Sequence, residues 1–93
     1  MGRRTIDDSE APNIDKFATG AKIMARMRQL KKRARQVADE TYTTPAVVYS
    51  WTKGAALPGM TNMARLALCL GCGIDDLVVM EGDKGGKRID VDA

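Results

Sequence analysis

The feature that most constrains the fold is a pair of short apolar segments, separated by a break, within residues 45–77. In the first segment, Val48 and Trp51 lie one helical turn apart, so both side chains can face the same core. Gly54 can adopt the left-handed conformation that ends a helix, and Pro58 prevents helix until the chain restarts. The pattern predicts two short helices joined by a tight connection, with Trp51 as a core anchor.

Two further helices are expected before this pair. Residues 15–28 carry apolar side chains at helical spacing, with Asn13 or Asp15 as the N-cap and Phe17 extending the buried stripe. Residues 32–41 show the same periodicity. The buried face of this second helix is expected to consist of Ala34, Val37, Ala38 and Thr41.

Three helices are expected in the second half of the chain. Thr44 offers a hydroxyl N-cap and Pro45 suits the first helical position, so a helix is predicted over residues 45–53. Apolar faces predict two more helices over residues 60–70 and 74–80. The inward side chains of the last helix are expected to be Ile74, Leu77 and Val78. No strand pattern appears, so the predicted fold is all-α, a compact domain of five helices.

Both ends of the chain lack apolar periodicity. We therefore expect an N-terminal arm over residues 1–13, a folded domain over 14–80 and a flexible tail over 81–93. A chain of 93 residues has room for one modest core. No apolar stretch is long enough to span a membrane and no secretory signal is visible, so a cytoplasmic protein is expected.

The charged residues are segregated along the sequence. Between Lys16 and Arg65 there are ten Lys and Arg but only two acids, a local balance of +8, although the net charge is +3. A basic middle between acidic ends favours a polyanionic partner such as nucleic acid. Charge alone is equally consistent with a well-solvated helical surface.

Cys69 and Cys72 form a C-x-x-C pair. A structural zinc site needs four ligands, and the chain offers two Cys and no His. A redox motif would require a strand-loop-helix setting, whereas Cys69 falls inside an apolar helix. We expect two reduced, structural cysteines and neither metal nor cofactor. Because the chain also lacks a Ser with a candidate base, no enzymatic activity is expected.

Residues 47–58 read V-V-Y-S-W-T-K-G-A-A-L-P, and residues 62–77 open with N-M-A-R-L-A-L-C-L-G and end in D-D-L. On these motifs the chain resembles the Cro/repressor (XRE-type) helix-turn-helix family. The opening I-D-K-F-A-T-G at residues 14–20 is similar to that of some small bacterial members. The resemblance covers residues 14–80 and implies a five-helix, lambda-repressor-like DNA-binding domain.

In that family the third helix lies in the major groove. The resemblance therefore implies double-stranded DNA as the partner, a homodimer on a symmetric site, no small-molecule ligand, and a role as a transcriptional regulator of bacterial, phage or mobile-element origin. It places the base-contact positions at Thr44, Pro45, Ala46 and Ser50. Together with the local charge, it places the backbone-contact positions at Lys32, Arg33, Arg35, Tyr49 and Lys53.

Two departures from the family pattern bear on these assignments. Where the family often has G-L-[ST]-Q, with the Gln bound to a phosphate, residues 29–35 are cationic, which can preserve phosphate affinity but not the same geometry. None of the four base-contact positions offers a bidentate base contact. Direct readout is therefore expected to be poor, or supplemented by Tyr49, Lys53, the Arg3/Arg4 arm or DNA shape.

A second class of function stays open. The same scaffold could serve as a protein-interaction module, antitoxin-like or an adaptor. In that case Ala46, Val47 and Tyr49 would bind protein rather than bases.

Overall fold

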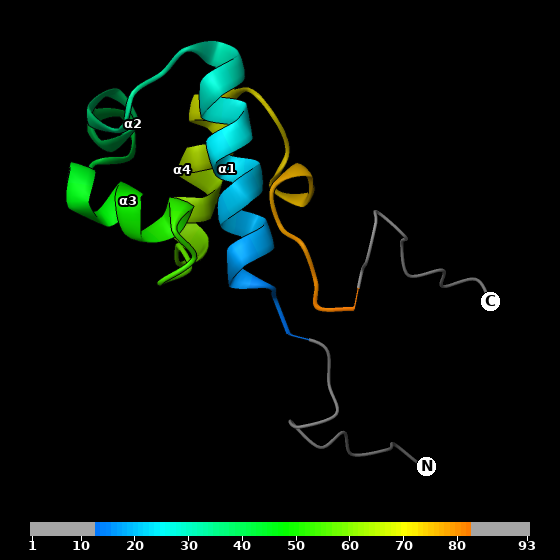
Figure 1. Cartoon of the computed structure of the whole chain (residues 1–93). Coiled ribbons are helices and arrows are strands. Elements are labelled where there is room, and N and C mark those ends of the chain that lie inside the picture. The colour runs from blue at the N-terminus through cyan, green and yellow to red at the C-terminus, as the bar shows by residue number, and fades with distance from the viewer. Residues whose placement is uncertain (1–12, 83–93) are drawn as a thin grey trace.

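The computed structural model describes residues 13–82. Within that range the chain forms four α-helices, α1 (Lys16–Leu30), α2 (Ala34–Thr41), α3 (Pro45–Thr52) and α4 (Met60–Leu70), followed by a short 3₁₀ helix, η1 (Ile74–Asp76). α3 packs against α1 and α2, whereas α4 packs against α2, α1 and η1 (Figure 1). The all-α prediction is confirmed for these residues. Most of the predicted arm and tail, residues 1–12 and 83–93, lies outside the described range.

The predicted helix starts have the expected caps. The Asp15 carboxylate accepts a hydrogen bond from the Ala18 N–H at 2.9 Å and thereby caps α1. The Thr44 hydroxyl accepts one from the Val47 N–H at 3.3 Å, and Pro45 occupies the first turn of α3. Each cap satisfies an N–H that the helix cannot satisfy itself.

Left-handed residues separate the first three helices. Lys31 follows α1 with φ of 58° and Tyr42 follows α2 with φ of 60°, although neither is glycine. This conformation is unfavourable for a side chain with a Cβ. The turn at Lys31 also explains why α2 begins at Ala34, two residues later than the sequence predicts.

The core confirms the predicted inward faces of α2 and α3, and α4 buries Met63, Leu66, Ala67 and Leu70. Trp51 is 3% exposed and Val48 is fully buried, so the predicted core anchor is correct. Thr41 is also buried, and its hydroxyl donates to the Val37 carbonyl at 2.8 Å. The largest fully buried apolar side chains are Ile23, Leu66, Leu70, Leu77, Val37 and Val48.

The predicted fifth helix is wrong. Only η1 forms, and the chain then runs extended to pair with the segment before α1. The Asp15 N–H donates to the Val79 carbonyl at 2.7 Å, and the Glu81 N–H donates to the Asn13 carbonyl at 2.7 Å. The β-branched pair 78–79 favours this extended pairing over helix.

Two side chains predicted to face the core do not. Phe17 is 72% exposed and lies against Gly54 at the edge of the core: a Cβ on Gly54 would lie 2.6 Å from the Phe17 Cδ1 and 2.8 Å from its Cα. Ile74 is 42% exposed, because the 3₁₀ turn presents Leu77 to the core in its place. Leu77 is buried as predicted and Val78 packs against the core.

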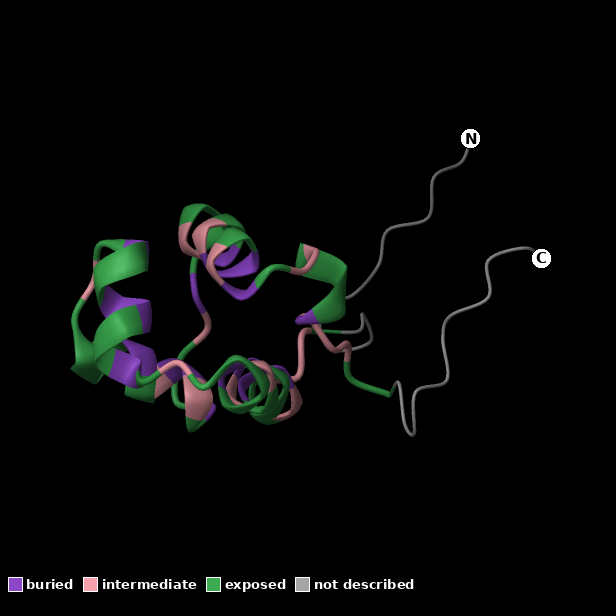
Figure 2. Ribbon diagram, turned by 90° about the horizontal axis from the view of Figure 1, so that it is seen from above, coloured by how far each residue is buried: buried purple, intermediate pink, exposed green. Residues whose placement is uncertain are grey.

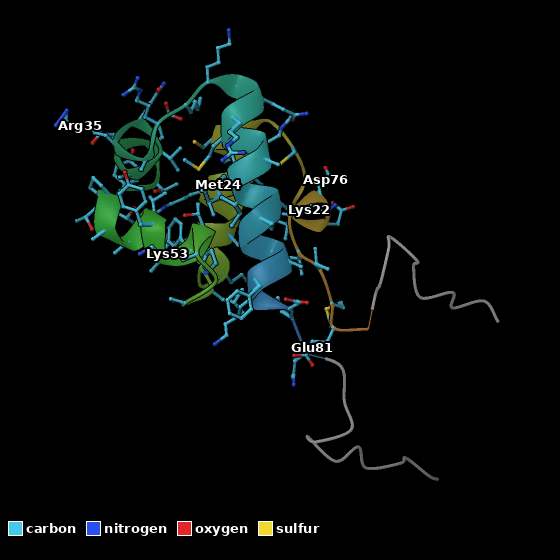
Figure 3. The ribbon with its side chains drawn as sticks, in the orientation of Figure 1. Lys22, Met24, Arg35, Lys53, Asp76 and Glu81 are labelled. Atoms are coloured by element: carbon cyan, nitrogen blue, oxygen red, sulfur yellow. The ribbon has the colours of Figure 1, made fainter. Side chains whose placement is uncertain are left out.

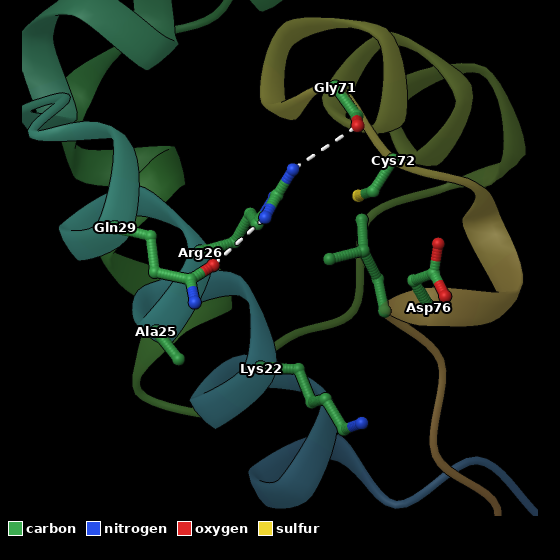
Figure 4. A pocket seen from close by; sticks show the side chains of 8 residues that line it. Lys22, Ala25, Arg26, Gln29, Gly71, Cys72 and Asp76 are labelled. Atoms are coloured by element: carbon green, nitrogen blue, oxygen red, sulfur yellow. Dashed lines mark hydrogen bonds between the residues drawn. The ribbon is translucent and has the colours of Figure 1, made fainter.

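An arginine joins the two longest helices. The Arg26 Nε on α1 donates to the Leu70 carbonyl at 2.9 Å, and its Nη2 donates to the Gly71 carbonyl at 3.2 Å (Figure 4). The carbonyls at the end of α4 have no partner within the helix, so the cation both satisfies them and complements the helix dipole. The Arg26 Nη1 donates a further hydrogen bond to the Gln29 Oε1 at 2.9 Å.

Candidate nucleic-acid interface

One face of α3 is free of the core along the whole helix. Val48 and Trp51 point inward, which turns Ala46, Tyr49 and Lys53 outward. Tyr49 is 52% exposed, as expected for a residue on the far side of the helix from the core. Thr44, Pro45 and Ala46 are all exposed at the N-terminal end. The structure therefore brings the four predicted base-contact positions and Tyr49 to one helix.

The hydroxyl of Ser50 is partly committed within α3. Its Oγ donates to the Val47 carbonyl at 2.6 Å, so the hydrogen is used and only oxygen lone pairs face outward. Ser50 is half-buried, whereas Ala46 one turn earlier is exposed. The chemistry that this face offers is thus a methyl group, a phenol and hydroxyl acceptors rather than amide or guanidinium forks.

Close backbone contact fixes α3 against α1. A Cβ on Gly20 would collide with the Trp51 carbonyl oxygen and lie 2.8 Å from the Thr52 carbonyl oxygen. At the next turn, Gly54 has φ of 78°, as predicted for a helix-ending glycine, and lies against Phe17. Gly20 therefore allows the backbones of α1 and α3 to approach closely, and Gly54 leaves room for the Phe17 ring and backbone.

Exposed cationic side chains lie at the start of α2, which packs against α3, and at the end of α3. Arg33 is the N-cap residue of α2 and supplies no side-chain cap, while Arg35 lies in the first turn; both are exposed. In Figure 3, Arg35 extends away from the body of the domain. Lys53 is the exposed C-cap residue of α3, and its N–H donates to the Tyr49 carbonyl at 2.9 Å. The side chains of these three cations are therefore exposed to solvent.

Lys32 differs from the other predicted backbone contacts. Its Nζ donates to the Glu40 Oε1 at 2.7 Å and to the Cys69 carbonyl at 2.8 Å, so it joins α2 to the end of α4. The hydrogen bond with Glu40 raises the pKa of Lys32. The pKa of Glu40 is lowered, first by the hydrogen bond from Cys69 and then by that from Lys32. The ammonium of Lys32 thus already has intramolecular partners.

The two cysteines are free thiols on different sides of the end of α4. The Cys69 Sγ donates to the Glu40 Oε1 at 2.9 Å on the α2 side. Burial, followed by the hydrogen bond with Glu40, raises the pKa of Cys69 to about 11. Cys72 lines a groove of about 420 Å³ beside α1 (Figure 4), and burial raises its pKa too. Within residues 13–82, no group of three or more potential metal ligands comes together.

Two polar contacts were not predicted from the sequence. Arg26 binds the end of α4 from 44 residues away, and the Arg65 guanidinium carbon lies 5.0 Å from the centroid of the Tyr42 ring. Neither pair has a sequence spacing that signals a contact. The only available hint was the concentration of cations on predicted helices.

The geometry can be set beside known proteins. No protein-family model matches the chain, and no curated protein matches it by sequence. Among solved structures it is similar to the P22 c2 repressor protein in complex with synthetic operator 9T, with a TM-score of 0.62, 25% identity, and coverage of 63% of this chain and 89% of that chain. It is also similar to ClgR, the clp gene regulator of Corynebacterium glutamicum, with a TM-score of 0.64, 18% identity, and coverage of 67% and 66%. The chain has a repressor-like helix-turn-helix fold.

A third similarity is to HppE, solved with iron(II) and a substrate. The TM-score is 0.63 at 25% identity, and the alignment covers 69% of this chain but 37% of that chain. The chain therefore spans little more than a third of HppE, and the similarity concerns that part alone.

Among the described residues, no helix has the length and apolar character needed to cross a bilayer.

Proposed function

We propose that this chain is a DNA-binding transcriptional regulator of the XRE type that inserts α3 into the major groove of duplex DNA. The observation that carries the proposal is the exposed outer face of α3, a helix whose backbone packs closely against α1 at Gly20. The similarity to the P22 c2 repressor, solved with an operator, supports it. Bacterial, phage or mobile-element origin and a cytoplasmic location belong to the same proposal.

Affinity would come mainly from phosphates. Arg33, Arg35 and Lys53 are exposed at the start of α2 and at the end of α3, and each phosphate that they neutralise releases a condensed counterion. The uncapped N-terminus of α2, next to Arg33, adds backbone N–H groups and a favourable dipole. Lys32 is different, since its ammonium already binds Glu40 and Cys69. We assign Lys32 to the scaffold and keep the other four predicted backbone contacts.

Sequence selectivity would be modest and would come from few groups. Ala46 can contact a thymine methyl, and the Thr44 and Ser50 oxygens can accept from either kind of base pair. Since no side chain on this face can make a bidentate base contact, DNA shape would contribute a large share. Two copies on a symmetric site would raise both affinity and selectivity. We also infer a binding role without catalysis, because the chain has no His and no activated Ser.

A salt titration tests the proposal. Fluorescence anisotropy with a labelled duplex should show binding that weakens linearly in log Kd against log salt. Arg33→Ala, Arg35→Ala and Lys53→Ala should each weaken binding to all duplexes alike and reduce the slope by about one unit. Lys22→Ala is the matched control. Lys22 is a cation on α1 that lines the groove together with Asp76 of η1, and it does not lie on α3 (Figure 3). The proposal fails if no duplex binds even at low salt, or if Lys22→Ala is as damaging as the others.

The protein-interaction alternative has one specific observation in its favour. Val47 and Tyr49 are exposed beside Ala46, which makes the α3 face more apolar than a base-reading helix requires. A partner protein could cover that face. Binding that is insensitive to salt and to Arg35→Ala, but abolished by Ala46→Glu, would favour this alternative over DNA.

A further inference from the structure

The free side of α4 carries an apolar ridge. Met60 and Leu68 are 85% and 84% exposed, and Ala64 between them is also exposed. Residues four apart are neighbours on a helix surface, so the three side chains form a line about 12 Å long. Figure 2 colours the side of α4 that is turned away from α1 as exposed. Within the described part of the chain, no other element covers this α4 ridge.

We propose that two copies of the chain associate through the α4 ridge. This inference deepens the proposed function, because it names the surface by which the homodimer forms. It is separate from the base-reading face, since α3 and α4 pack on shared neighbours and do not pack extensively on each other. The two surfaces belong to different helices and can be altered separately.

The ridge is complementary to itself. When two helices cross in the commonest packing class, the i±4 ridges of both helices interdigitate. Met60, Ala64 and Leu68 are such a ridge, and a second copy related by a twofold axis supplies an identical one. The small Ala64 at the midpoint lets the helices approach, while Met60 and Leu68 fill the space on either side. An unrelated partner would need to carry the same pattern.

Charge also points to a second copy. The chain is basic overall, yet α4 carries no acid and a single base, Arg65. Arg65 lies one turn before Leu68 at the border of the ridge, and its guanidinium is held over the Tyr42 ring that follows α2. The α4 ridge is thus a place where two cationic copies can meet with little repulsion, and where a charged partner would gain nothing.

The size of the surface predicts a weak dimer. At its N-terminal end the ridge continues into an apolar hollow of about 220 Å³, lined by Ile14, Pro58, Met60, Met63 and Ile74. The surface that the three ridge side chains and this hollow can bury is smaller than the ~800 Å² that each partner buries in a standard interface. We therefore expect a dissociation constant in the micromolar range or weaker for the free protein. Binding of both copies to one duplex would strengthen the contact.

Sedimentation velocity of the full chain, from low micromolar to millimolar concentration, tests the ridge without DNA. The wild type should shift from monomer to dimer, and Leu68→Glu should remain monomeric. Ala21→Glu is the matched control: it adds the same charge to an exposed position of α1 and should dimerise like the wild type. A wild type that stays monomeric throughout, or a Leu68→Glu variant that dimerises equally well, overturns the proposal. Leu68 is exposed, so circular dichroism should show that the variant is folded.

Oxidative crosslinking gives a positive readout. In a Cys69→Ser/Cys72→Ser background, Ala64→Cys should form a disulfide-linked dimer, because the two copies of residue 64 lie next to the twofold axis. Ala21→Cys in the same background should crosslink only slowly, and equal rates for the two variants would contradict the interface.

A DNA-binding measurement separates the two proposals: Leu68→Glu should retain its affinity for a single half-site. If the wild type binds no duplex DNA, the proposed function is refuted. The sedimentation experiment still tests dimerisation through the α4 ridge in that case.

Discussion

At the scale of single residues, a few side chains determine whether the domain folds and how α3 is held. Trp51 is the only large ring in the core, and Gly20 lets α1 and α3 approach through their backbones. The sequence identified Trp51 and Gly54 from spacing alone. The contact of Gly20 with the Trp51 carbonyl depends on how two helices cross, which no local pattern encodes.

Truncation of Trp51 should severely destabilise the domain. Trp51→Ala removes a buried aromatic, which costs on the order of 3–5 kcal/mol in a protein with few kcal/mol to spare. Thermal unfolding followed by circular dichroism measures the loss. Tyr49→Ala, on the exposed side of the same helix, is the control and should change stability by less than about 1 kcal/mol. Equal effects of the two substitutions would contradict the packing of α3.

Relief of a left-handed residue should stabilise the protein. Lys31 has φ of 58°, so Lys31→Gly should raise the free energy of unfolding by about 1 kcal/mol. The same substitution at Lys22, inside α1, should lower it by about 1 kcal/mol. Urea denaturation of the two variants therefore compares one chemical change in two backbone conformations. A loss of stability in both would show that Lys31 does not adopt the left-handed conformation.

At the scale of secondary-structure elements, polar clamps tie α4 to its neighbours. Arg26 joins it to α1, and the cluster of Lys32, Glu40 and Cys69 joins it to α2. The sequence predicted the four α-helices correctly because each has an apolar face and most have a cap or a breaker. The intramolecular partners of Lys32 could not be predicted, because charge in a sequence carries no information on which groups will meet in the fold.

The cluster at Glu40 predicts a pH dependence of stability. The pKa of Glu40 is lowered in the folded state, so its stabilising effect is present above the ordinary carboxyl pKa and disappears as the pH falls through the lowered value. The wild type should therefore be more stable than Glu40→Gln near neutral pH, and the difference should vanish in acid. Because the pKa of Lys32 is raised, the difference should also fall in strongly alkaline solution.

Urea titrations of both proteins across the pH range measure this difference. Asp39→Asn, which removes a neighbouring exposed carboxylate from the same helix, is the control. A stability difference for Glu40→Gln that stays constant from acid to neutral pH would contradict the hydrogen bonds from Cys69 and Lys32.

At the scale of the whole molecule, the arrangement of helices separates two surfaces. The α3 face and the α4 ridge belong to different helices, which do not pack extensively on each other. In the proposed function, one surface binds DNA and the other joins two copies. This division predicts that changes on α3 alter which DNA is bound, while changes on α4 alter how many copies bind.

Substitutions on α3 should change sequence preference without changing the salt dependence. Ala46→Gln adds an amide that can bind adenine through two hydrogen bonds, so it should shift selected sites at one position by about 1–3 kcal/mol of discrimination. Selected-site sequencing, combined with the slope of log Kd against log salt, measures both effects. Leu68→Gln makes a comparable change on α4 and should leave the selected half-site unaltered. An unchanged site preference for Ala46→Gln would place α3 outside the groove.

The sequence by itself determined the helices, the caps at Asp15 and Thr44, the Trp51 core and the outward face of α3. These features depend on contacts within a few residues, where periodicity, capping and glycine act directly. Only the tertiary structure decided the fate of residues 74–81, the exposure of Phe17 and the partners of Lys32. In each case a segment distant in sequence competes for the same group. The isolated bridge between Ile14 and Met80 replaces a helix, and Cys69 on α4 supplies a carbonyl to an ammonium that would otherwise face solvent.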